Sequence, residues 1–292
     1  MSNKPTQLLV EQWITLTNGQ VHYTQALDGQ VDKAYWPHLR MIFKRMCEKG
    51  LIEQVGNKDG LYRLIENQAR PVDWQSVEKL KDSHVVLPFD LRKYVFIYPD
   101  TTIVVAGSKS SGKSGFLYRT IIMNMEKMVV ILLTNLEGGI NMLRDRFDSM
   151  DVEIPVPAPF DVIPVYNNYH DYIKRPDTLY VIDYIDVPDG ESFYLIAALI
   201  KKIDQKLQGL NSVAVIGLQK PSGRDTAFGG EGTLKAPSLY IAMDSHKLKI
   251  VDAKVPANPK IHPKNMQWSF DYDESGTKFV NIQRCFTQWE GE

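Results

Sequence analysis

Five short apolar runs rich in β-branched residues dominate the sequence after residue 84. They read TTIVVAG (101–107), MVVILLTN (128–135), TLYVIDY (178–184), SVAVIGLQ (212–219) and SLYIAMD (238–244). Helix-length segments with apolar residues at helical spacing separate most of them, such as SGFLYRTIIMNM and SFYLIAALIKKIDQKLQGL. Near-continuous apolar strands that alternate with helices are typical of a parallel sheet covered on both faces. We therefore expect an α/β domain with a mostly parallel central sheet over residues 85–292, closed by antiparallel strands in KLKIVDAK and MQWSFDYDESGTKFVNI.

The first of these runs leads into a loop rich in glycine and serine, and then into a helix-length segment. Gly107, Gly112, Lys113 and Ser114 fit the pattern G-x-x-x-x-G-K-S/T in the strand-loop-helix setting that it requires. Glycines let the backbone turn its N–H groups toward phosphates, and the helix N-terminus adds partial positive charge. The loop therefore predicts a nucleoside triphosphate, ATP with Mg²⁺, held by the following residues: Gly107, Ser108, Lys109, Ser110, Ser111, Gly112, Lys113, Ser114 and Gly115.

Two carboxylates stand at the ends of neighbouring strands of this pattern. Asp183 ends the run LYVID, and Glu137 comes just after VVILLTN. The carboxyl ends of strands in an open α/β sheet face one crevice, so both can meet the phosphate loop there. Lys113 is expected to reach the β- and γ-phosphates, and Ser114 and Asp183 to lie on the Mg²⁺ side. Both carboxylates could instead be ordinary polar residues of strand-end turns.

Residues 1–66 form a smaller unit with a different pattern. LLVEQWITL has helical spacing, and YWPHLRMIFKRMCEKGLI places Leu39, Ile42, Phe43 and Met46 on one face of a second helix. Two short strand candidates, LIEQV and LYRLI, are joined by GNKDG, whose Asp-Gly pair is a hairpin signal. A helix followed by a hairpin resembles the winged-helix class, which makes this an expected small α+β domain. Polar residues 67–84 are expected to be a linker.

Basic side chains of this small unit suggest a contact surface. Arg40, Lys44 and Arg45 lie on the polar side of the second helix, and Lys58 lies at the hairpin tip. In a winged helix these are the places that touch duplex DNA. A solvated helix face in a module that docks a protein partner explains the same residues equally well, because three or four bases are an ordinary surface density.

Charge, hydropathy and cysteine content limit the kinds of binding partner and the cellular compartment that we expect. The 292 residues carry a formal net charge of −1, so nucleic acid would have to be held by a local basic patch. No apolar run reaches the length of about 18 to 20 residues that a membrane span needs, and the N-terminus lacks the order of a signal peptide. Cys47 and Cys285 lie far apart without metal-type spacing. We expect a cytoplasmic protein with reduced thiols and no membrane partner.

Taken in order, the motifs resemble the ATPase domain of DnaB-type replicative helicases, within the wider RecA-like group. The matching stretches, over roughly residues 85 to 283, are IYPDTTIVVAGSKSSGKS, NLEGGINMLRDR, LYVIDYID and VAVIGLQKPSGRD. The resemblance implies a RecA-like fold that hydrolyses ATP with Glu137 as general base and Gln219 as the γ-phosphate sensor. It also implies a homo-oligomeric ring or filament with the nucleotide between subunits.

One stretch departs from that family. A lysine and an arginine two residues later are expected to reach the neighbouring subunit's γ-phosphate; here Lys254 is kept, but Pro256 replaces the arginine. An arginine finger can be worth several orders of magnitude in rate. Either Lys254 works alone, another residue such as Arg224 substitutes, or hydrolysis is slow.

The segment QKPSGRDTAFGGEGTLKAP, residues 219–237, resembles the loop that lines the family's central channel. Its glycines and its bases Lys220, Arg224 and Lys235 suit contacts to the phosphates of a single strand, and Phe228 could stack on a base. An ordinary flexible connection has a similar composition. The leading expectation is a helicase or translocase on single-stranded nucleic acid, DNA rather than RNA, in replication or recombination. The alternative is a nucleotide-switched assembly or regulatory ATPase that recruits partners to DNA without unwinding.

Overall fold

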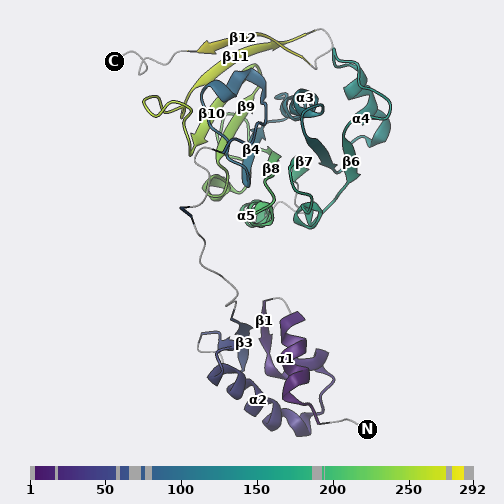
Figure 1. Cartoon of the computed structure of the whole chain (residues 1–292), viewed down its shortest axis with the longest axis vertical. Helices are drawn as coiled ribbons and strands as arrows, with labels where there is room; N and C mark the ends of the chain where they lie inside the picture. The colour runs from purple at the N-terminus through teal and green to yellow at the C-terminus, as the bar shows by residue number, and fades with distance from the viewer. Residues whose placement is uncertain are drawn as a thin grey trace. The chain divides into compact units, whose positions relative to one another are not determined.

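A computed structural model describes residues 4–16, 19–56, 60–65, 74–75, 81–185, 193, 195–273 and 278–285. The chain divides into two compact units, Met1–Val77 and Glu78–Glu292, each with a hydrophobic core of its own (Figure 1). None of the described helices is long and apolar enough to cross a membrane.

The first unit is a three-stranded antiparallel sheet packed with helices. Its elements are α1 (Gln7–Leu16), β1 (Gln20–His22), the 3-10 helices η1 (Tyr23–Gly29) and η2 (Lys33–Tyr35), α2 (Trp36–Glu48), β2 (Ile52–Gln54) and β3 (Leu61–Leu64), with sheet order β1-β3-β2. The helix face predicted for Leu39, Ile42, Phe43 and Met46 is confirmed, because all four are buried in the core of this unit. The predicted hairpin is confirmed as the β2–β3 pair.

The second unit contains a nine-stranded sheet. Its strands are β4 (Thr101–Gly107), β5 (Val129–Thr134), β6 (Asp161–Pro164), β7 (Thr178–Ile185), β8 (Val213–Gln219), β9 (Leu239–Asp244), β10 (Lys247–Ala253), β11 (Gln267–Tyr272) and β12 (Phe279–Cys285). The order is β12-β11-β10-β9-β4-β8-β7-β5-β6. Strands from β9 to β6 in this order pair in parallel, and β10, β11 and β12 add antiparallel strands at one edge. The predicted mostly parallel sheet with an antiparallel extension is therefore confirmed.

Helices cover both faces of this sheet because its strands are apolar on both sides. In β4, Ile103 and Val105 join one core and Val104 and Ala106 the other. α3 (Lys113–Asn124) and α4 (Gly139–Asp148) pack into the first core, and α5 (Leu195–Leu207) packs into the second, on the opposite face (Figure 1).

The end of the expected linker belongs to the second unit. Ser83 N donates to the Ile97 carbonyl at 3.1 Å, and Asp82 forms an ion pair with Arg92. Residues 82 and 83 are thus fixed against the domain that was expected to begin at residue 85.

Candidate nucleotide site

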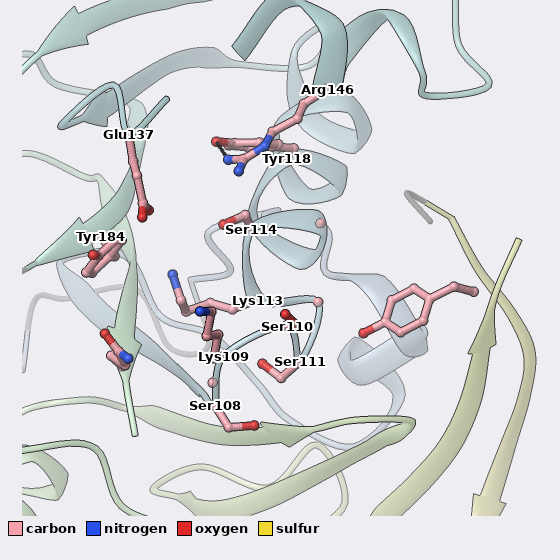
Figure 2. A pocket seen from close by; sticks show the side chains of 15 residues that line it. Ser108, Lys109, Ser110, Ser111, Lys113, Ser114, Tyr118, Glu137, Arg146 and Tyr184 are labelled. Carbon is pink, nitrogen blue, oxygen red and sulfur yellow. Dashed lines mark hydrogen bonds between the residues drawn. The ribbon is translucent and has the colours of Figure 1, made fainter. Parts of the chain in front are cut away.

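A cleft of about 730 Å³ opens at the carboxyl ends of β4, β5, β7 and β8. It is lined by all nine residues predicted to cradle phosphates, Gly107 to Gly115, and by Tyr118, Glu137, Arg146, Tyr184, Gln219 and Tyr272 (Figure 2). The cleft therefore collects the phosphate loop, the proposed base and the proposed sensor at one place.

The phosphate loop leaves β4 at Gly107 and enters α3 at Lys113. Gly112 has a φ of +84°, and a Cβ atom there would lie 2.3 Å from the Tyr272 hydroxyl oxygen. At Gly107 a Cβ atom would lie 2.4 Å from Ser111 Oγ. Only glycine fits at these two positions, which explains in steric terms why the motif needs both.

Asp183 accepts hydrogen bonds from Lys113, which is expected to contact the phosphates, and from Ser114, which is expected to bind the metal. Lys113 Nζ and Ser114 Oγ each donate to Asp183 Oδ1 at 3.2 Å, and Asp183 is only 4% exposed. Two groups that a Mg²⁺–triphosphate would need thus lie within hydrogen-bond reach of the third, Asp183. Mg²⁺ usually takes one or two protein oxygens and completes its shell with water and phosphate oxygens, and Ser114 and Asp183 fit that demand.

Glu137 reaches the cleft from a tight turn after β5. Leu136 N donates to Thr134 Oγ1 at 3.1 Å and Glu137 N donates to Asn135 Oδ1 at 3.2 Å, while Gly138 takes a φ of +81°. Figure 2 shows the Glu137 carboxylate directed into the cleft, toward the side where Lys113 and Ser114 lie.

A second, small cavity shares walls with this cleft. Its volume is about 10 Å³, close to the space that one water molecule needs. Glu137, Asp183, Tyr118 and Arg146 contribute to its lining. A water molecule held there would touch the carboxylate that we expect to act as the base.

Four lining residues were not singled out from the sequence: Tyr118, Arg146, Tyr184 and Tyr272. Burial and the Asp183 carboxylate raise the pKa of the Tyr118 phenol well above its usual range, so the hydroxyl stays protonated. Arg146 Nη1 donates to that hydroxyl at 3.5 Å, and the Lys113 ammonium lies 4.3 Å from the Tyr184 ring centre. Helical spacing could have identified Tyr118, which lies one turn after Ser114 in α3.

Tyr272 reaches the cleft from β11, at the edge of the sheet. Burial raises the pKa of its phenol to about 12, and its buried hydroxyl finds no hydrogen-bond partner among the described residues. No local pattern in the sequence points to Tyr272, because its place depends on how the β11–β12 hairpin lies beside the loop.

Gln219 ends β8 opposite Gly107 of β4, where the expected sensor role would need it. The next residue, Lys220, does not lie on the surface as its expected contact with nucleic acid would need. Lys220 is only 2% exposed, and its Nζ donates to Asp244 Oδ1 at 2.7 Å. The expected nucleic-acid contact of Lys220 is therefore not possible in this conformation, because its side chain turns inward to the end of β9.

The other bases of segment 219–237 lie on the surface. Arg224 and Lys235 are exposed, while the Phe228 ring stacks on Phe193 with 4.5 Å between ring centres. Lys254 is also exposed, and its Nζ donates to the carbonyls of Lys235 and Ala236 at 3.1 and 2.8 Å.

The basic residues expected on the first unit lie on two sides of α2. Arg40 and Lys44 line a groove of about 350 Å³ together with Tyr23, Cys47, Gln54 and Tyr62. The Arg40 guanidinium lies 4.9 Å from the Tyr23 ring centre. Arg45 is exposed and does not line this groove, and Lys58 lies outside the described residues.

No protein-family model and no curated protein matches the sequence. Solved structures match its fold. A KaiC-like protein from the hyperthermophilic archaeon Pyrococcus horikoshii OT3 matches with a TM-score of 0.52 and 14% identity, covering 68% of this chain and 97% of that chain. The RadB recombinase matches with a TM-score of 0.45 and 12% identity, covering 62% of this chain and 91% of that one. The likeness to the KaiC-like protein, together with the sheet order, shows a RecA-like α/β fold with a mostly parallel central sheet.

Proposed function

We propose that this protein is an ATPase whose turnover drives movement on single-stranded nucleic acid, similar to the DnaB-type helicases. The observation that carries the proposal is the single cleft that collects the phosphate loop, Glu137 and Gln219, with Asp183 beside Lys113 and Ser114. A simple nucleotide-binding turn would need only the loop. A carboxylate base beside the loop is the feature that hydrolysis requires.

In this proposal each side chain has one task. Lys113 places its ammonium on the β- and γ-phosphates, and the loop N–H groups hold the remaining oxygens. Ser114 and Asp183 hold Mg²⁺, which neutralises developing charge on the phosphates when it is bound. Glu137 accepts a proton from the attacking water, and Gln219 contacts the γ-phosphate from the end of β8.

The proposed nucleic-acid contacts come from two places. Arg224 and Lys235 supply exposed positive charge in segment 219–237, where the family lines its channel. In the first unit, α2 presents Arg40 and Lys44, and Arg45 on its other side, in a sheet order that supports a winged-helix-like domain. We propose that this unit binds duplex DNA or a protein partner and so brings the motor to its site of action, and that the motor works as a homo-oligomer.

The motor proposal is tested by ATP turnover with and without a single-stranded oligonucleotide, together with unwinding of a forked duplex. We expect stimulation of at least about tenfold, weakened in the double variant Arg224→Ala/Lys235→Ala. The double variant Lys127→Ala/Lys201→Ala, which removes two exposed lysines outside segment 219–237, serves as the charge-matched control. Turnover that ignores the oligonucleotide, with no unwinding, would rule out the motor.

A second candidate function has its own observation. The segment that holds Pro256, where the family has an arginine, is paired with residues 94–96: Phe96 N donates to the Val255 carbonyl at 3.0 Å and Ala257 N to the Tyr94 carbonyl at 2.9 Å. No arginine finger can come from this position. A nucleotide-switched assembly ATPase that hydrolyses slowly and recruits partners to DNA fits this departure. It predicts slow turnover that the oligonucleotide does not change, with oligomer formation that depends on ATP.

A further inference from the structure

An ion pair between a buried lysine and a half-buried aspartate lies at the root of the phosphate loop. Lys220 follows the last residue of β8, and its side chain has no exposed surface. Its partner Asp244 is the last residue of β9, and its side chain is 35% exposed. An unpaired ammonium is costly to bury, so the position of Lys220 depends on this one carboxylate.

The pair spans the root of the loop. β4 lies between β8 and β9 in the sheet, so Lys220 reaches across the end of β4 to meet Asp244. Lys220 N donates to the Gly107 carbonyl at 3.0 Å, and Ser108 N donates to the Met243 carbonyl at 3.2 Å. The first two residues of the phosphate loop are thus held from both sides by the strands that carry the pair.

The Ser108 side chain completes the connection. It lies near the Asp244 carboxylate, which therefore faces both Lys220 and the loop. Burial alone would raise the pKa of Asp244, but the hydrogen bond and charge of Lys220 and the nearby Ser108 hydroxyl hold that pKa below its usual value. At neutral pH the Asp244 carboxyl is accordingly ionised.

We propose that Lys220 and Asp244 are positioning residues that fix the root of the phosphate loop and thereby set its affinity for nucleotide. The inference rests on the proposed function only in requiring that the cleft binds a nucleotide. A buried ion pair is a poor source of stability, since apolar residues of similar size often serve as well or better. Apolar residues in place of Lys220 and Asp244 would not hold the phosphate loop in position.

The test compares stability with nucleotide affinity in the double variant Lys220→Met/Asp244→Leu. We expect its unfolding temperature to equal or exceed that of the wild type, whereas its affinities for ADP and for a non-hydrolysable ATP analogue both fall about tenfold or more, since small misplacements of binding groups are costly. Lys249→Met is the matched control, because it breaks an ion pair with Asp225 of the same 2.7 Å length that lies nearer the surface. This control should bind both nucleotides normally.

Each outcome bears on one claim. A folded double variant that binds ADP with the affinity of the wild type would overturn the positioning role. A loss of affinity for the ATP analogue alone would overturn it too, because that result would place the effect at Gln219 and not at the root of the loop. Asp244→Asn, which keeps the shape of the side chain, should show the same loss of ADP affinity and serves if the double variant does not fold. A wild-type protein that binds neither nucleotide would instead refute the proposed function.

Discussion

Among single residues, Lys113 is the side chain on which we expect the proposed nucleotide binding to depend most. Its ammonium contacts Asp183 and the Tyr184 ring and is largely buried, so it is already ordered before any phosphate arrives. Charge-assisted hydrogen bonds of this kind contribute about 1.5 to 3 kcal/mol each. We expect Lys113→Ala to weaken ATP-analogue binding by about 10- to 100-fold or more, measured by titration calorimetry.

The control for this prediction is Lys127→Ala, in the turn after α3, where the side chain is exposed. It changes the net charge by the same amount without touching the cleft. Equal affinity for the analogue in wild type and Lys113→Ala would show that the loop does not hold the triphosphate as described.

Residue identity alone predicted much of this site. The nine loop residues and Glu137 line one cleft, because the motif and the strand end that carry them follow from local sequence pattern. Gln219, which lines the same cleft, was expected there only from the resemblance to the helicase family. Lys220 behaves differently because its partner Asp244 comes 24 residues later and is brought near only by sheet order. The positive charge of Lys220 predicted an exposed side chain that contacts nucleic acid. In the structure the Lys220 side chain is instead buried, because it pairs with Asp244.

Among the elements, β9 holds the segment that follows β8. The Tyr240 hydroxyl accepts a hydrogen bond from Ala227 N at 2.9 Å and pairs with Thr233 Oγ1 at 3.1 Å. Tyr240→Phe removes both contacts, and a hydrogen bond of this kind contributes about 0.5 to 1.5 kcal/mol. We expect faster amide exchange and faster proteolysis in residues 221–237.

Tyr180→Phe is the matched control for that loop. Its hydroxyl, on β7, binds the backbone of Lys174 and Arg175 instead. The control should loosen residues 174–175 and leave 221–237 unchanged. If both variants show wild-type exchange in 221–237, the Tyr240 hydroxyl does not hold the segment.

Another contact between elements predicts a dependence on pH. Asp151 accepts hydrogen bonds from Arg119 of α3 and from Lys278, which precedes β12, and these bonds lower the pKa of its carboxyl to about 2. A pKa lowered on folding means that the contacts stabilise the domain above about pH 4 and that this stabilisation is lost as the pH falls through about 2.

Chemical denaturation of Asp151→Asn checks this sign. The pairs are partly exposed, so we expect the variant to be less stable than the wild type by at most about 1 kcal/mol at pH 7. The difference should shrink as the pH falls toward 2. A difference that stays constant or grows with acid would contradict the assigned contacts.

Local sequence pattern predicted most, but not all, of the strands in the parallel part of the sheet. The five β-branched runs appear as β4, β5, β7, β8 and β9. The edge strand β6 was not predicted, because Asp161–Pro164 is short and ends in proline, which argues locally against a strand. Tyr272 entered the cleft without a local signal, because the position of β11 beside the loop is set by pairing across the sheet edge.

In the whole molecule, each unit has hydrophobic core clusters of its own, one in the first unit and two in the second, so we expect the units to fold separately. We expect residues 78–292 alone to bind the ATP analogue with the affinity of the full chain, since every lining residue of the cleft lies in that unit. Affinity for duplex DNA, measured by fluorescence anisotropy at fixed salt, should fall when residues 1–77 are removed. Unchanged duplex affinity would leave protein docking as the role of the first unit.

In the proposed function, Glu137 converts a nucleotide-binding loop into a hydrolytic site. Single-turnover hydrolysis of ATP by the wild type and by Glu137→Gln, at enzyme concentrations that bind all the nucleotide, tests it most directly. A general base contributes about 10²- to 10⁴-fold to rate. We predict that Glu137→Gln binds ATP as tightly as the wild type and hydrolyses it at least about 100-fold more slowly. Equal rates in the two proteins would contradict the assignment of the base.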